Sequence, residues 1–128
     1  MRKSVVSVLS MVVVILLATQ VFAEYDKEFV VEKMRANGAA MGALNKAAGE
    51  GEFFAAAEQL MEIAKNEKAL QAVEPPKGSE EEWNRIHGDI VKAAFMGIGA
   101  CGEEDAEKLQ EQTAKIGALI KEGHGMFR

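Results

Sequence analysis

The chain has 128 residues, a formal net charge of -5 and one cysteine, Cys101. Hydrophobic residues make up 48% of it and charged residues 27%, which fits one globular domain and excludes disordered, collagen-like and disulfide-framework classes. The acidic balance offers no surface to a phosphate backbone, so no nucleic-acid partner is expected. No Ser/His/Asp arrangement, phosphate-binding loop or cysteine-based zinc spacing indicates an enzyme.

Residues 1–23 have the pattern of a secretory signal peptide. Arg2 and Lys3 precede an apolar run over residues 5–17, and small residues stand before the expected cleavage point. A membrane anchor is the alternative, but the run is shorter than the roughly 20 residues that span a bilayer. We therefore expect an exported, periplasmic domain over residues 24–128, whose net charge becomes -7 once the two basic residues are removed.

Four segments after this leader have apolar residues at helical spacing, and no segment alternates with a period of two. The first helix is expected over residues 26–48, with Asp26 as its N-cap and the glycine-rich residues 49–51 as its stop. Its apolar stripe comprises Val30, Met34, Met41, Leu44 and Ala48.

The second and third helices flank a proline pair. The second is expected over residues 52–73, because the prolines at 75–76 do not fit inside a helix. Ser79 and Glu82 form a capping box that opens the third helix, and the glycines within residues 97–102 are expected to end it. The stripes comprise Phe53, Ala57, Leu60 and Ala64 in the second helix, and Trp83, Ile86, Ile90, Ala93 or Ala94, and Gly97 in the third.

The fourth helix is expected to begin with the acidic residues 103–105, which suit the positive end of a helix dipole. Its stripe comprises Leu109, Thr113, Ile116, Ile120 and Phe127. Short connections make sequential helices antiparallel neighbours. The sequence therefore predicts an all-α fold, an antiparallel up-down-up-down four-helix bundle.

Met34 and His124 are candidate ligands in the core of this bundle. His124 follows Ile120 by four residues and precedes Phe127 by three, which places it on the inward stripe of the last helix. The start of the first helix and the end of the last lie at one end of such a bundle, so Met34 and His124 are level to about one turn. A thioether opposite an imidazole is a ligand pair of haem iron in electron-transfer cytochromes.

Plainer interpretations of the same residues stay open. A core methionine usually fills space, and a histidine in a last helical turn favours the negative end of the dipole. Trp83, the sole tryptophan, is by default a core residue. Gly117, Gly123 and Gly125 each cost about 1 kcal/mol in a helix interior, a cost tolerated where a flat group approaches the backbone or where the helix end frays.

The C-terminal tail resembles that of the cytochrome c prime family, in which a C-x-x-C-H haem-attachment motif is followed by two residues and an aromatic-Arg pair. His124, Phe127 and Arg128 match this pattern. Ile120 and Gly123 stand in place of the two cysteines. Covalent attachment of haem through this motif is therefore not expected.

The chain also resembles the soluble cytochrome b-562 family, which has the same bundle, holds haem without covalent bonds and ends in His-x-x-aromatic-Arg. Met34 matches its second axial ligand, the Pro-Pro-Lys loop at residues 75–77 matches its loop, and Trp83 matches an aromatic residue near its haem. An arginine four residues before the axial histidine of that family is replaced here by Ile120. The likeness covers roughly all of residues 24–128.

The resemblance implies a non-covalent haem b with Met34 and His124 as axial ligands and Arg128 near the propionates. The implied function is one-electron transfer by an exported carrier without substrate turnover, and its acidic surface suits transient docking to a basic redox partner protein. The apolar wall of the haem site would comprise Met41, Trp83, Ile120 and Phe127.

Three other functions stay open. A five-coordinate haem bound through His124 alone, with Met34 as a distal wall, would bind a gas such as nitric oxide, as in cytochrome c prime. A haem-free bundle would act as an interaction or stress-related protein. The third alternative is the binding of a metal ion by His87 and His124. The sequence leaves Cys101 buried, free or in an intermolecular disulfide, and it identifies no face for the homodimer that is common in cytochrome c prime proteins.

Overall fold

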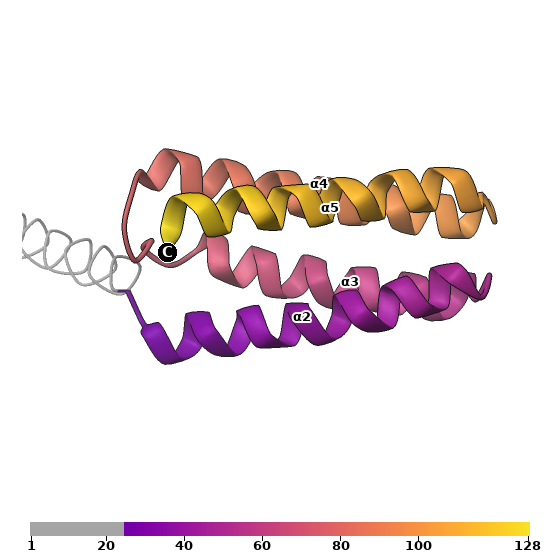
Figure 1. Cartoon of the computed structure of the whole chain (residues 1–128), viewed down its shortest axis with the longest axis horizontal. Coiled ribbons are helices and arrows are strands. Elements are labelled where there is room, and N and C mark those ends of the chain that lie inside the picture. Colours follow the sequence, from indigo (N-terminus) through magenta and orange to yellow (C-terminus); the bar gives the residue numbers. More distant parts are fainter. Residues whose placement is uncertain (1–24) are drawn as a thin grey trace, which may run out of the picture.

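The computed structural model describes residues 25–128, so the expected signal peptide lies outside the described residues. The helices are α2 (Lys27–Gly49), α3 (Phe53–Gln71), α4 (Glu80–Gly102) and α5 (Ala106–Phe127), and no strand occurs among the described residues. Each helix runs antiparallel to the one before it (Figure 1). The predicted all-α, up-down-up-down four-helix bundle is confirmed.

Three of the helices begin at an acidic or hydroxyl side chain that caps their first turn. The side chains of Asp26, Ser79 and Asp105 each accept a hydrogen bond of 3.0–3.2 Å from the backbone N–H three residues later. Two of these caps were predicted, but the start of α5 was placed too early. Glu103 and Glu104 lie in the turn before α5, where Glu104 has a φ of 54°.

One predicted helix end was wrong, since α3 ends at Gln71, two residues before Val73. The predicted end of α4 within residues 97–102 is confirmed, but the helix continues through Gly97 and ends at Gly102. A Cβ at Gly97 would lie 2.9 Å from Cδ1 of Leu60, so this glycine permits a close approach of α3 and α4 and does not stop the helix.

The residues predicted to be buried in α4 and α5 are buried, apart from Ile120, which is half-buried. In α2 and α3 the buried face is rotated about the helix axis relative to the predicted stripe. In α2 the residues Met34, Met41 and Ala48 are half-buried, and in α3 the same holds for Phe53 and Ala57. The fully buried residues of these two helices are Val30, Asn37, Ala40, Leu44 and Ala47 in α2, and Ala56, Leu60, Ile63, Ala64, Asn66, Glu67 and Leu70 in α3.

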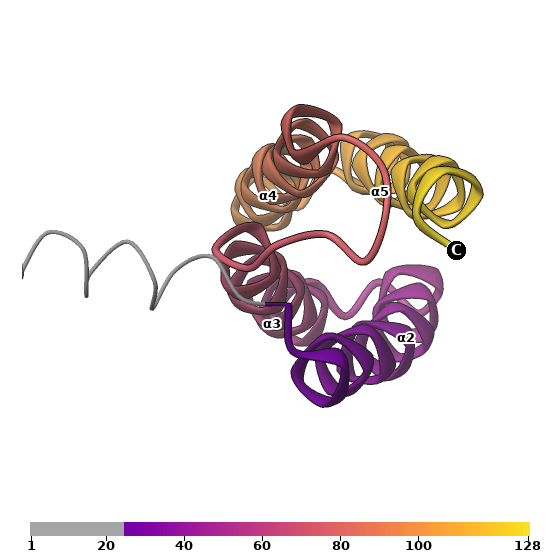
Figure 2. The same cartoon turned by 90° about the vertical axis from the view of Figure 1, so that its left-hand side faces the viewer.

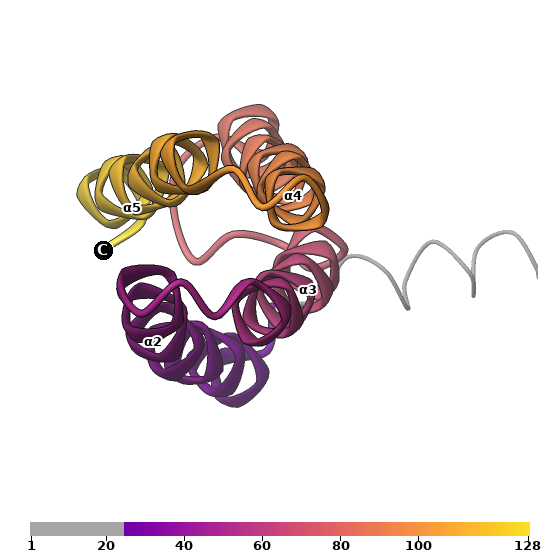
Figure 3. The ribbon, with the colours of Figure 1, turned by 90° about the vertical axis from the view of Figure 1, so that its right-hand side faces the viewer.

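The helices follow one another around the bundle axis, as the end views in Figures 2 and 3 show. Each packs closely on the next in sequence, whereas α2 and α5 contact each other far less. The connection between α3 and α4 crosses the end of the bundle at which the chain terminates (Figure 2). There Gly78 has a φ of 84° and lies against the Phe127 ring, which closes part of this end.

None of the helices formed by residues 25–128 has an apolar stretch long enough to cross a bilayer.

Candidate functional site

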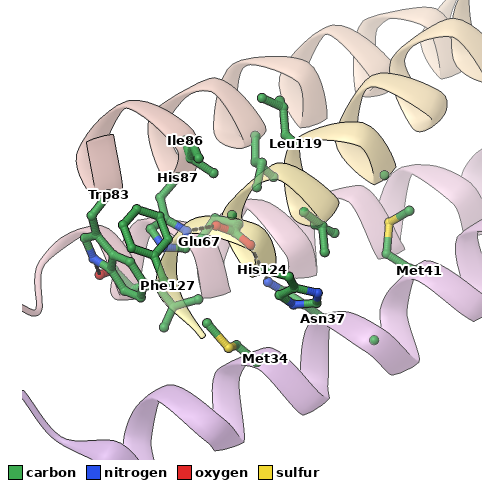
Figure 4. Close-up of a pocket in the computed structure, with 16 residues that line it drawn as sticks. Met34, Asn37, Met41, Glu67, Trp83, Ile86, His87, Leu119, His124 and Phe127 are labelled. Carbon is green, nitrogen blue, oxygen red and sulfur yellow. Dashed lines mark hydrogen bonds and ion pairs between the residues drawn. The ribbon is translucent and has the colours of Figure 1, made fainter. Parts of the chain in front are cut away.

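A cavity of about 300 Å³ lies at the end of the bundle where the chain terminates, and all four helices line it (Figure 4). Its walls are mainly apolar side chains. The least tightly packed pair of neighbouring helices, α2 and α5, supplies ten of its sixteen lining residues. The residues predicted for the site that line this cavity are Met34, Met41, Trp83, Ile120, His124 and Phe127.

Arg128, the remaining predicted residue, lines a second space of about 420 Å³. Met34, His124 and Phe127 line both spaces, so the two adjoin at these side chains. Arg35, which was not predicted, also lines the second space. The outer part of the site thus has two exposed arginines, whereas the inner part is mainly apolar.

Met34 and His124 lie on different helices, α2 and α5, and both are half-buried at the junction of the two spaces. Burial lowers the pKa of His124 below its ordinary 6.5, and the positive charge of Arg128 lowers it further. The neutral imidazole, which is the form that binds a metal, is therefore favoured at neutral pH. The structure brings the predicted ligand pair together at one site.

A buried polar chain crosses the interior beside this pair. Asn37 Nδ2 donates a hydrogen bond of 2.6 Å to Glu67 Oε1, and the other carboxylate oxygen of Glu67 pairs with His87 Nδ1. The three residues come from α2, α3 and α4, line the cavity, and are only 3–5% exposed. We call Asn37, Glu67 and His87 the polar chain.

Two atoms of the polar chain lack a partner. Asn37 Oδ1 and His87 Nε2 are buried with no hydrogen-bond partner among the described residues. Buried polar atoms are usually paired, because an unmade hydrogen bond costs about 1–3 kcal/mol. The polar chain is therefore a place where a ligand, a proton or a water molecule would be accommodated.

The polar chain was missed by the sequence analysis, although a signal for it exists. Asn37 follows Val30 and precedes Leu44 by seven residues, and Glu67 follows Leu60 by seven, so both polar residues lie in register with buried apolar ones. His87 was considered only as a metal ligand. A polar residue at a core position of a helix is the pattern that would have found them.

Trp83 is fully buried and holds the wall next to His87. Its Nε1–H donates a hydrogen bond of 2.9 Å to the Leu70 carbonyl. Its ring meets the rings of His87 and Phe127 edge-on, at centroid distances of 4.1 and 5.0 Å. Trp83 is thus both a core residue and part of the cavity wall, and it restrains the imidazole of the polar chain.

Gly117 and Gly123 of α5 line the cavity, whereas Gly125 does not. A Cβ at Gly117 would meet no atom within 4 Å, and one at Gly123 would lie 3.5 Å from Ile86. Packing therefore demands glycine at neither position. The missing side chains leave the backbone of α5 open to a flat group.

Cys101 lies near the C-terminal end of α4, at the opposite end of the bundle from the cavity, and it is buried. Burial raises the pKa of its thiol, so the sulfur stays protonated. Within residues 25–128 no three His, Cys, Asp or Glu side chains cluster as a metal site would require. Haem iron needs fewer protein ligands, since the porphyrin supplies the rest.

Comparison with family models, with curated proteins and with solved structures finds no match to this chain.

Proposed function

We propose that the protein binds non-covalent haem b in this cavity and acts as an exported, periplasmic one-electron carrier. The observation that carries the proposal is that Met34 and His124, from opposite ends of the described chain, line one mainly apolar cavity. An imidazole and a thioether are the axial ligands of low-spin electron-transfer haems. The resemblance to the cytochrome c prime and b-562 families supports the same assignment.

The dimensions and charges of the site suit a flat apolar group with acidic substituents. The interior cavity of about 300 Å³ continues into the outer space of about 420 Å³. Small-molecule sites commonly measure about 300–1,000 Å³. Arg35 and Arg128 line the outer space, where each guanidinium can pair with a carboxylate such as a haem propionate.

Each residue of the site then has a separate task. His124 and Met34 supply the axial ligands, and the favoured neutral state of His124 keeps its lone pair available. Met41, Trp83, Ile120 and Phe127 line the cavity as an apolar wall that excludes water. Bound haem supplies the one-electron chemistry, while ligand identity and the dryness of the cavity set its reduction potential.

Titration of the purified mature protein with haemin tests this proposal. We expect one haemin per chain, a low-spin absorption spectrum, and complete extraction of the pigment by acid-acetone because no thioether bond forms. His124→Ala should abolish the low-spin spectrum, and Met34→Ala should convert it to a high-spin one. Met96→Ala is the control, since this methionine is 59% exposed and does not line the cavity.

The same titration separates the alternatives. A high-spin wild-type spectrum that Met34→Ala leaves unchanged would assign the site to five-coordinate, gas-binding haem. A chain that remains colourless after addition of haemin would refute haem binding and leave a haem-free bundle.

A further inference from the structure

Glu67 and His87 of the polar chain come from the two helices that do not carry the proposed axial ligands. Met34 and His124 belong to α2 and α5, whereas Glu67 and His87 belong to α3 and α4 (Figure 4). Neither carboxylate nor imidazole is needed to hold the proposed haem. A buried acid and a buried histidine beside a redox centre nevertheless change the electrostatics of electron transfer, because charges interact strongly where water is excluded.

The hydrogen bonds of the polar chain fix where a proton would go. Both oxygens of the Glu67 carboxylate are engaged, one by Asn37 Nδ2 and one by His87 Nδ1. With an ionised Glu67, whose carboxylate only accepts hydrogen bonds, Nδ1 of His87 is the donor and the lone pair of a neutral ring lies at Nε2. Since Nε2 of His87 has no partner among the described residues, it is the atom of the polar chain that can accept a proton.

Charge balance couples this atom to the redox state. With His87 neutral, the polar chain has the single negative charge of Glu67, which favours the oxidised, more positive haem. An electron entering the cavity removes that positive charge and leaves the buried carboxylate uncompensated. A buried charge without a partner is costly, so a proton on His87 Nε2 restores neutrality by making the Glu67–His87 pair an ion pair.

We propose that the polar chain takes up one proton when one electron enters the cavity, so that electron transfer by this protein is coupled to proton transfer. This inference rests on the proposed haem function. The electron comes from a one-electron donor protein and the proton from solvent, and one N–H bond forms at His87 Nε2. Re-oxidation releases the same proton.

The surroundings of His87 contain few competing titratable groups. Of the cavity-lining residues, only Glu67, His87 and His124 are titratable, from α3, α4 and α5, and α2 contributes the neutral Asn37. His124 is committed to the iron in the proposed function. Arg35 and Arg128 face the outer space and keep their charge throughout the accessible pH range.

Potentiometric titration of the haemin-loaded mature protein between about pH 5 and about pH 9 tests the coupling. If one proton is taken up per electron, the reduction potential should fall as the pH rises, by up to about 59 mV per pH unit over part of this range. For a one-electron couple, a tenfold change in proton concentration corresponds to about 59 mV. A pH-indicator dye in weakly buffered solution should independently report up to one proton taken up per electron added.

Glu67→Gln and His87→Gln should both flatten the slope and abolish the proton uptake. Glu67→Gln should also raise the potential at high pH, because it removes the buried negative charge while keeping the size of the side chain. Glu58→Gln, on the exposed face of the same helix, is the matched control and should change neither. If His87→Gln fails to fold, the near-isosteric Glu67→Gln carries the test.

The failures are distinguishable. A haem-loaded wild type whose potential does not change with pH overturns the proton coupling and leaves the proposed function intact. A slope that survives Glu67→Gln overturns the assignment to the polar chain. A protein that binds no haemin overturns both proposals.

Discussion

Gly97 and Gly99 lie two residues apart on α4 and differ in what surrounds them. Gly97 is buried against Leu60, whereas a Cβ at Gly99 would meet nothing within 4 Å. Both glycines were predicted to end the helix, because the low helix propensity of glycine is a property of the local sequence. The approach of α3 that gives Gly97 its role is a tertiary contact, and no local pattern encodes it.

Gly97→Ala should destabilise the bundle by about 1–3 kcal/mol, because the new methyl group must displace Leu60 in a packed core. Gly99→Ala is its matched control and should stabilise the protein by up to about 1 kcal/mol through helix propensity alone. Urea unfolding followed by circular dichroism measures both. Equal effects of the two substitutions would contradict the packing role assigned to Gly97.

For the individual helices, the first residues were easier to predict from the sequence than the buried faces. Asp26 and Ser79 cap their helices as expected because the capping hydrogen bond joins residues three apart in sequence. The buried face of α2 depends on where α3 and the cavity lie. Met34 and Met41 therefore line the cavity half-buried, while Asn37 is buried.

Asp105 caps α5, the helix that positions His124 and Phe127. Asp105→Ala should lower the free energy of unfolding by about 1 kcal/mol, because the N–H of Lys108 loses its acceptor. Thermal unfolding measures the effect. Glu111 is exposed in the second turn of α5, and Glu111→Ala should change the free energy of unfolding by less than about 0.5 kcal/mol. A loss as large as that of Asp105→Ala would show that charge and not capping is responsible.

In the whole molecule, the candidate ligand pair was predictable because topology alone brings the two ends of the chain to one end of a bundle. The core positions of Asn37 and Glu67 could have been predicted from their spacing, but the hydrogen bonds that join them to His87 could not, because they require three helices to meet at one depth. The apolar stripes and the short connections predicted the class of fold, whereas the position of Arg35 at the outer space follows only from the packing of α2 beside α5.

The stability of the folded protein should depend on pH through His124. Its pKa is lowered by burial, so below about 6.5 the unfolded chain binds the proton more readily than the folded one. The free energy of unfolding should therefore fall as the pH drops from 6.5 towards the lowered pKa. Urea unfolding gives the free energy of unfolding of wild type minus that of His124→Gln, and this difference should fall on acidification. A difference that does not change with pH would contradict the burial effect.

The weak contact between α2 and α5 affects the order in which the bundle assembles. The closest packing is between helices that are consecutive in sequence, so α2, α3 and α4 can associate before α5 has been synthesised. The cavity wall that α5 supplies lies within residues 117–127, which are synthesised after the other three helices. The cavity therefore stays accessible on its α2–α5 side until α5 docks, and this wall forms only in the last step of bundle assembly.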